Sequence, residues 1–148
     1  MDQTTSPTAF DVARFFLTLS EPEEGDWVSN LKLQKLCYYG QGFHLAMFDE
    51  PLFPDSIVAW EHGPVVPELY RHYKAHGEDA IPVPTDVDFG VLPERAQDLL
   101  REVWNTYGQF SAWKLRNLTH DEPPWAETSR NAVISHDKLR EYFKTQLK

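Results

Sequence analysis

The strongest helical signal in the chain lies in residues 29–47, which read SNLKLQKLCYYGQGFHLAM. Their apolar residues recur at spacings of three and four, which places them along one face of a helix. Ser29 or Asn30 can cap the first turn, because a side-chain oxygen there accepts a hydrogen bond from a free backbone amide. Gly40 within the apolar face favours a close crossing by a second helix. The polar residues off that face are interpreted as solvated: Lys32, Gln34, Lys35 and Gln41.

Helices of similar character are predicted on both sides of this stretch. Proline at a first turn, glycine just past an end and serine at an N-cap mark their boundaries. These signals predict helices that begin at Ser6-Pro7, near residue 67, near residue 93, at Ser111 and at Ser135. Residues 57–60 are partly β-branched and predict a short extended segment, paired with a second strand at residues 81–89. The fold class is therefore mainly α, with about five to six helices and a two-strand element.

Length and composition predict one compact domain over residues 1–148. The chain has 41% apolar, 14% aromatic and 25% charged residues, which is typical of a globular protein. The core is expected at about residues 9–127, followed by a C-terminal helix at about residues 135–147. Residues 1–5 are expected to form a loose end.

The charge balance excludes some partners. Fourteen Lys and Arg against twenty-three Asp and Glu give a formal charge of −9, which opposes approach to a phosphate backbone. We therefore expect no direct binding of nucleic acid. No apolar run is long enough for a membrane helix and the N-terminal residues lack a secretory pattern, so we expect no membrane contact and a cytoplasmic location. A lone cysteine, Cys37, excludes an intrachain disulfide and a cysteine-rich zinc site.

Six histidines raise the question of a metal or catalytic site. His72 and His76 share a helix face, but the intervening residues lack the glutamate of a zinc-protease motif, so this face is interpreted as solvated. Cys37 and His44 lie on the apolar face of the 29–47 helix and are interpreted as core residues. No common local signature of an enzyme is present, and neither a metal nor a cofactor is expected.

A metal-dependent enzyme or hydrolase remains an alternative interpretation. It would use one of the histidines His44, His62 or His120 together with a nearby carboxylate, such as Glu61 or Asp121.

Two further segments combine prolines with aromatic residues: AWEHGPVVPELY at residues 59–70 and LTHDEPPW at residues 118–125. In the first, Trp60 and Tyr70 can clasp the bend that glycine and proline create. In the second, a helix ends at His120 and Trp125 follows two prolines. Each segment can be a rigid structural corner or a binding surface, and the residues alone leave both interpretations open.

Taken together with LKLQKL at residues 31–36, YYGQGFHLA at residues 38–46 and PLF at residues 51–53, these segments resemble the Panacea-domain family. This family includes SocA-like antitoxins and phage-associated GepA-like proteins. The resemblance covers roughly residues 9–127, in order and at the expected spacing. It departs from the usual pattern at Gly40, Phe43 and His62, and the departure at His62 leaves the surface of that corner in doubt.

The resemblance implies an antitoxin, not an enzyme, that neutralises a cognate protein toxin by direct binding. The toxin would be encoded by the adjacent gene. Two alternatives are implied as well: a proteolytic adaptor that delivers the toxin to a ClpXP-type protease and so contacts a protease chaperone, or a phage or prophage accessory protein that blocks a host defence protein.

Six residues of these segments are candidates for partner binding or for a structural role: Lys35, Trp60, His62, Tyr70, His120 and Trp125. The choice of partner is expected to lie in less patterned stretches at residues 20–28, residues 78–92 and the final helix.

Overall fold

The computed structural model of the chain describes residues 6–147, which form a mainly helical fold with one two-stranded sheet. In chain order the elements are α1 (Ala9–Leu19), η1 (Pro22–Glu24), α2 (Asn30–Phe48), β1 (Val58–Trp60), β2 (Gly63–Val65), α3 (Pro67–Tyr73), η2 (Lys74–His76), η3 (Phe89–Val91), α4 (Glu94–Tyr107), α5 (Ala112–His120), α6 (Pro123–Ala126) and α7 (His136–Lys144), where η marks a 3-10 turn.

The predicted fold class is confirmed. Residues 6–147 contain seven α-helices, one more than the upper expectation, because the two prolines predicted to open a turn begin the short helix α6. Proline suits the first helical turn, where its missing amide hydrogen is not needed. The predicted loose end at residues 1–5 lies outside the described residues.

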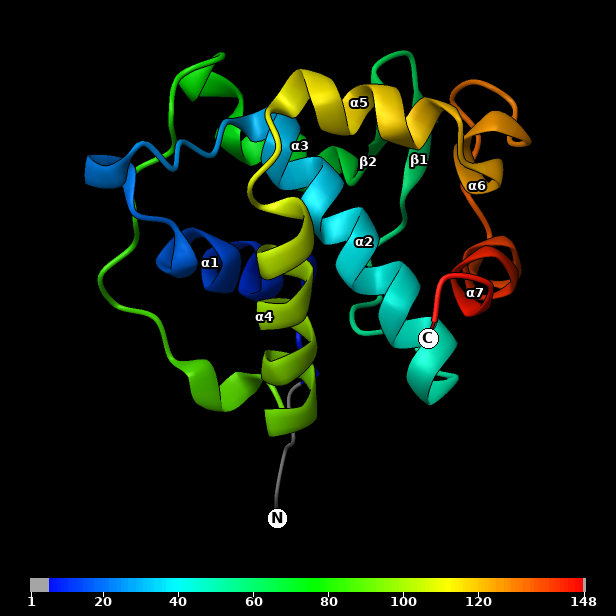
Figure 1. The fold of residues 1–148 in the computed structure, drawn as a ribbon, viewed down its shortest axis with the longest axis horizontal. Helices are drawn as coiled ribbons and strands as arrows, with labels where there is room; N and C mark the ends of the chain where they lie inside the picture. The colour runs from blue at the N-terminus through cyan, green and yellow to red at the C-terminus, as the bar shows by residue number, and fades with distance from the viewer. Residues whose placement is uncertain (1–5, 148) are drawn as a thin grey trace.

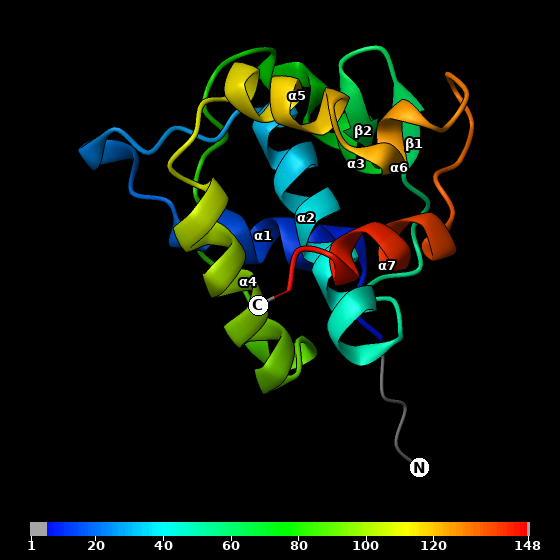
Figure 2. The ribbon, with the colours of Figure 1, turned by 45° about the vertical axis from the view of Figure 1, so that its right-hand side comes forward.

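Helix α2 lies in the middle of the molecule, as Figures 1 and 2 show, with α1, α4, α5, α7 and the hairpin packed around it. Every residue from 32 to 42 is buried. The interpretation of its polar residues as a solvated face is therefore wrong: Lys32, Gln34, Lys35 and Gln41 are all buried. Over residues 32–42, helix α2 therefore has no solvent-exposed face.

Hydrogen bonds to loop backbone compensate the burial of these polar side chains. Gln34 Oε1 accepts a hydrogen bond from the Val66 amide at 2.9 Å. Gln41 accepts one from the Leu52 amide and donates one to the Phe53 carbonyl, both at 2.7 Å. Since a buried polar group costs free energy unless it is paired, each bond fixes a loop at a defined point along α2.

Two glycines of α2 admit neighbouring helices. A Cβ atom on Gly40 would lie 2.9 Å from Leu100 Cδ2 of α4, which confirms the predicted close crossing. A Cβ atom on Gly42 would overlap the ring of Phe143 from α7. Both helices can pack against α2 only because these positions lack a side chain.

The sheet is an antiparallel hairpin, with Val58 opposite Val65 and Trp60 opposite Gly63. Gly63 has a φ of 112°, which only glycine adopts readily, so the chain can reverse after two residues. On the outer edge of β1, the Ala59 amide donates to the Ala132 carbonyl at 3.0 Å.

The predicted second strand at residues 81–89 is wrong. This stretch contains no strand, and the amide of Ile81 at its start donates to the Val28 carbonyl instead. Pro82 and Pro84 lack the amide hydrogens that a sheet ladder requires. Residues 63–65 and 131–134 occupy the two edges of β1 instead.

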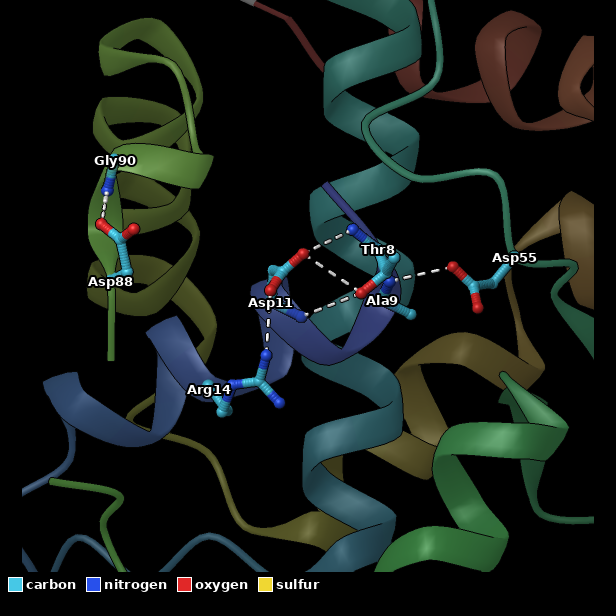
Figure 3. A network of polar contacts seen from close by, with 7 residues as sticks. All are labelled: Thr8, Ala9, Asp11, Arg14, Asp55, Asp88 and Gly90. Carbon is cyan, nitrogen blue, oxygen red and sulfur yellow. Dashed lines mark hydrogen bonds and ion pairs between the residues drawn. The ribbon is translucent and has the colours of Figure 1, made fainter. Parts of the chain in front are cut away.

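The start of α1 differs slightly from the prediction. Thr8, not Ser6, is the N-cap: its amide donates to Asp11 Oδ2 at 2.8 Å, and its hydroxyl accepts from the Asp11 amide (Figure 3). Asp55 adds a long-range bond from the Ala9 amide at 2.9 Å. The predicted serine caps of α2, α5 and α7 are confirmed, and α7 ends at Lys144, earlier than expected. Among residues 6–147, no helix is long and apolar enough to cross a membrane.

Candidate functional site

Three of the segments that carry the resemblance meet at Lys35. The Lys35 ammonium donates a hydrogen bond to the Pro64 carbonyl at 3.2 Å. A Cβ atom on Gly63 would lie 2.6 Å from Lys35 Cε and 2.9 Å from Thr119 Oγ1. Glycine is therefore needed at position 63 for two reasons: its positive φ, and the space that the missing side chain leaves for Lys35. Lys35 thus joins α2 to the hairpin, close to α5.

Lys35 is fully buried, with an exposed fraction of 0%. Burial, together with the nearby positive charge of Arg116, lowers the pKa of Lys35 to about 7. A side chain that does not reach the surface acts on a partner only through the elements it holds in place. We therefore assign Lys35 a structural role.

Trp125 bonds to the hairpin at Trp60, and His120 packs against Trp125. Trp125 Nε1 donates to the Trp60 carbonyl at 2.7 Å, and the His120 ring stacks on the indole with centroids 3.9 Å apart. The guanidinium of Arg130 lies over the same indole at 3.6 Å. Partial burial and the positive charges of Arg116 and Lys35 lower the pKa of His120. A neutral His120 suits a stacking partner.

The remaining predicted residues line one groove. Trp60, His62 and Tyr70 come together there with Leu31 and Trp113, around a volume of about 700 Å³. We name these five residues the tryptophan groove. The predicted clasp is present, since the rings of Trp60 and Tyr70 meet edge to face at 5.3 Å. Lys35, His120 and Trp125 lie outside the groove lining.

Trp113 was not among the predicted site residues. It is 59% exposed and projects from the first turn of α5. The exposure of Trp113 could have been predicted from the sequence. Leu115, Leu118 and Thr119 recur at spacings of three and four and mark the inward side of α5. Trp113 does not lie on that side of the helix. An exposed tryptophan with no core function marks a candidate contact site.

The other sequence candidates are accounted for by packing. Cys37 is buried as predicted, and burial raises the pKa of its thiol, so it stays protonated. His44 is a core residue whose Nδ1 lies 2.7 Å from the Glu50 carbonyl. His72 is exposed on α3, and the described part of the chain places no three potential metal ligands together.

A second buried cluster ties α2 to the segment before α6. Glu122 accepts hydrogen bonds from the hydroxyls of Tyr38 and Tyr39, each at 2.8 Å. Burial raises the pKa of Glu122 to about 7, although the two tyrosine bonds favour its charged form. Tyr39 also stacks on Tyr107 of α4 with centroids 3.9 Å apart. The carboxyl group is fully engaged and has a structural role.

The comparison with protein families identifies the class of this chain. The model of the family described as "Antitoxin SocA-like, Panacea domain" matches residues 33–126, more than half of the chain. The chain therefore belongs to this antitoxin family, and the predicted resemblance is confirmed.

A curated relative is Antitoxin SocA of Caulobacter vibrioides, which is 36% identical over 109 residues. The matched stretch covers 66% of this chain and 58% of the length of the relative. The comparison with solved structures found no match.

Proposed function

We propose that this chain is a cytoplasmic, non-catalytic antitoxin that neutralises a cognate protein toxin by direct contact through the tryptophan groove. Membership of the SocA-like family supports the antitoxin role. The observation that carries the choice of surface is the exposed Trp113, which lies beside the motif residues Trp60 and Tyr70 in one groove.

The chemistry of the groove suits a protein partner. Tryptophan and tyrosine dominate the binding energy of protein interfaces because each buries a large apolar area at little cost in conformational entropy. His62 and the guanidinium of Arg116, which are 3.2 Å apart, supply polar groups beside this apolar centre. An apolar centre with a polar rim is the usual anatomy of an interface.

Co-expression with the adjacent gene tests this proposal. The neighbour alone should inhibit growth, and this chain should restore growth and co-purify with it. Replacing Trp113→Ala should weaken binding by about tenfold or more, as expected for a central aromatic residue. Met47→Ala is the matched control, since Met47 is 48% exposed but lies outside the groove.

A neighbour that is harmless with and without this chain would contradict the antitoxin role. Equal binding by the two variants would contradict the choice of surface. The half-life of the neighbour's protein product should be the same in cells with and without this chain. A shorter half-life in the presence of this chain would indicate delivery to a protease in place of neutralisation by binding alone.

A further inference from the structure

A second exposed surface lies beside the tryptophan groove, on the loop of residues 20–28. Trp27 on this loop is 68% exposed, more than any other large hydrophobic residue among the described residues. The loop is held by its own bonds: the Glu24 amide donates to the Glu21 carbonyl at 2.8 Å, and Trp27 Nε1 donates to the Pro22 carbonyl at 3.2 Å. Figures 1 and 2 show this loop projecting from the molecule. The indole is therefore presented to solvent by an ordered turn.

A groove of about 670 Å³ runs from Trp27 toward α5 and is lined by Phe110 as well. It shares Ser29, Glu78 and Ala112 with the tryptophan groove. The two hollows therefore lie side by side, and one extended partner can contact both.

Asp26, Glu78 and Asp79 line this groove together with Trp27. The loop that carries Trp27 adds three more carboxylates, Glu21, Glu23 and Glu24. None of these six forms an ion pair with a residue in the range 6–147. Lys32 is the single cation in the lining of the groove, and its ammonium donates to the Gly108 carbonyl at 2.6 Å. Of the six, Asp26 lies close enough to Lys32 to offset in part the lowering of the lysine's pKa by burial, so the face keeps more carboxylates than cations.

Trp113 and Trp27 differ in whether a cation of the chain lies over the indole ring. The guanidinium of Arg116 lies over the Trp113 ring at 4.4 Å, whereas no Lys or Arg of residues 6–147 lies over Trp27. An exposed indole attracts cations by its quadrupole, and carboxylates on the same loop and groove add direct charge.

We propose that Trp27 and the six carboxylates, here named the acidic aromatic face, bind a basic segment of the partner protein. An arginine or lysine of that segment would stack on Trp27, while neighbouring cations pair with the carboxylates. Adjacent apolar residues of the partner would continue into the tryptophan groove. The identity of the partner rests on the proposed antitoxin function, but the chemistry of the face does not.

A synthetic peptide tests the face without any knowledge of the toxin. The probe is a labelled, end-blocked peptide of alternating arginine and glycine, followed by fluorescence anisotropy, with a glutamate–glycine peptide for comparison. The arginine peptide should bind, and the affinity should fall about tenfold or more between about 0.05 M and 0.5 M salt. The glutamate peptide should not bind.

Two pairs of variants separate the face from net charge. Glu23→Lys with Glu24→Lys should lower the affinity about tenfold. Glu102→Lys with Glu141→Lys changes the net charge by the same amount on α4 and α7, and should change the affinity far less. Trp27→Ala should weaken binding about threefold to tenfold, and because Trp27 is exposed the variant should keep its helical circular dichroism.

Equal losses in the two charge-reversal variants would overturn the proposal, because binding would then follow net charge alone. An unchanged affinity in Trp27→Ala would overturn the role of the indole. The same variants can be tested against the co-purified neighbour. If Glu23→Lys with Glu24→Lys leaves the affinity for the neighbour unchanged, the acidic aromatic face is not the binding site, but the antitoxin role stands. If the arginine peptide binds at the acidic aromatic face but the neighbour is harmless, the face is supported and the antitoxin role is contradicted.

Discussion

Replacing the buried lysine, Lys35→Met, should change how stability depends on pH. Lys35 has an ordinary pKa of 10.5 in the unfolded chain, and in the folded protein burial lowers its pKa to about 7. Between these values the unfolded state binds more protons than the folded state, so stability must rise with pH. Methionine has a similar length and an unbranched side chain, but it cannot titrate.

The expected size follows from the shift of the pKa. Below about pH 6, where both states carry the charge, burying the lysine costs about 5 kcal/mol. The cost falls by about 1–2 kcal/mol between about pH 7 and about pH 8.5, because Lys35 loses its proton at a lower pH in the folded protein than in the unfolded chain. The methionine variant lacks this trend. Its advantage in free energy of unfolding over the wild type should therefore shrink by that amount across the same range.

Urea denaturation of both proteins at several pH values measures this difference. Loss of the hydrogen bond from Lys35 to the Pro64 carbonyl adds a constant offset, and titrating groups remote from Lys35 cancel because both proteins contain them. His120, whose pKa Lys35 helps to lower from 6.5, is affected mainly below the pH range compared here. Lys114→Met, on the exposed side of α5, controls for removing one surface charge. A difference between wild type and Lys35→Met that stays constant within about 0.5 kcal/mol would refute the lowered pKa of Lys35.

Two further predictions concern packing and a second titrating group. Gly42→Ala should lower the free energy of unfolding by about 1–3 kcal/mol, because its Cβ would overlap the Phe143 ring. Gly40→Ala should cost less, since the nearest atom is the flexible end of Leu100 at 2.9 Å; equal losses in denaturation would contradict this ranking. Glu122, whose pKa is raised to about 7, binds its proton more tightly when folded, so it should lower stability as pH rises from about 5 to about 7. Glu122→Gln should remove about 2 kcal/mol of this loss, less than the full shift because Glu122 is partly exposed, and parallel stability curves for the two proteins would argue against it.

Much of the helical structure could be predicted because its signals are local. The serine caps at Ser29, Ser111 and Ser135 each lie within three residues of the amide they bind. The close crossing at Gly40 followed from a glycine within an apolar face. The family motifs also contain three of the residues that line the tryptophan groove, Trp60, His62 and Tyr70.

Features that depend on distant segments could not be predicted. Lys35 and Gln41 look solvated from spacing alone, because their hydrogen-bond partners lie 29 and 12 residues away, respectively. The partner of β1 was assigned to residues 81–89, although a tight turn at Gly63 made the nearer residues available. Spacing also placed Trp113 on the outer side of α5, but only the structure put it beside Trp60 and Tyr70.

The backbone bonds made by the glutamine and lysine side chains of α2 have a consequence for how the scaffold can change. They anchor the chain at residues 52–53, 64–66 and 108. Within the described chain, no side chain of α2 hydrogen-bonds to residues 20–28 or 78–92, which instead are joined to each other by the Ile81 amide and the Val28 carbonyl. Val28, Ile81 and Leu92 hold these two stretches in the core, whereas most of the residues between them are exposed. Substitutions at the exposed positions can therefore change this surface while the frame keeps its geometry.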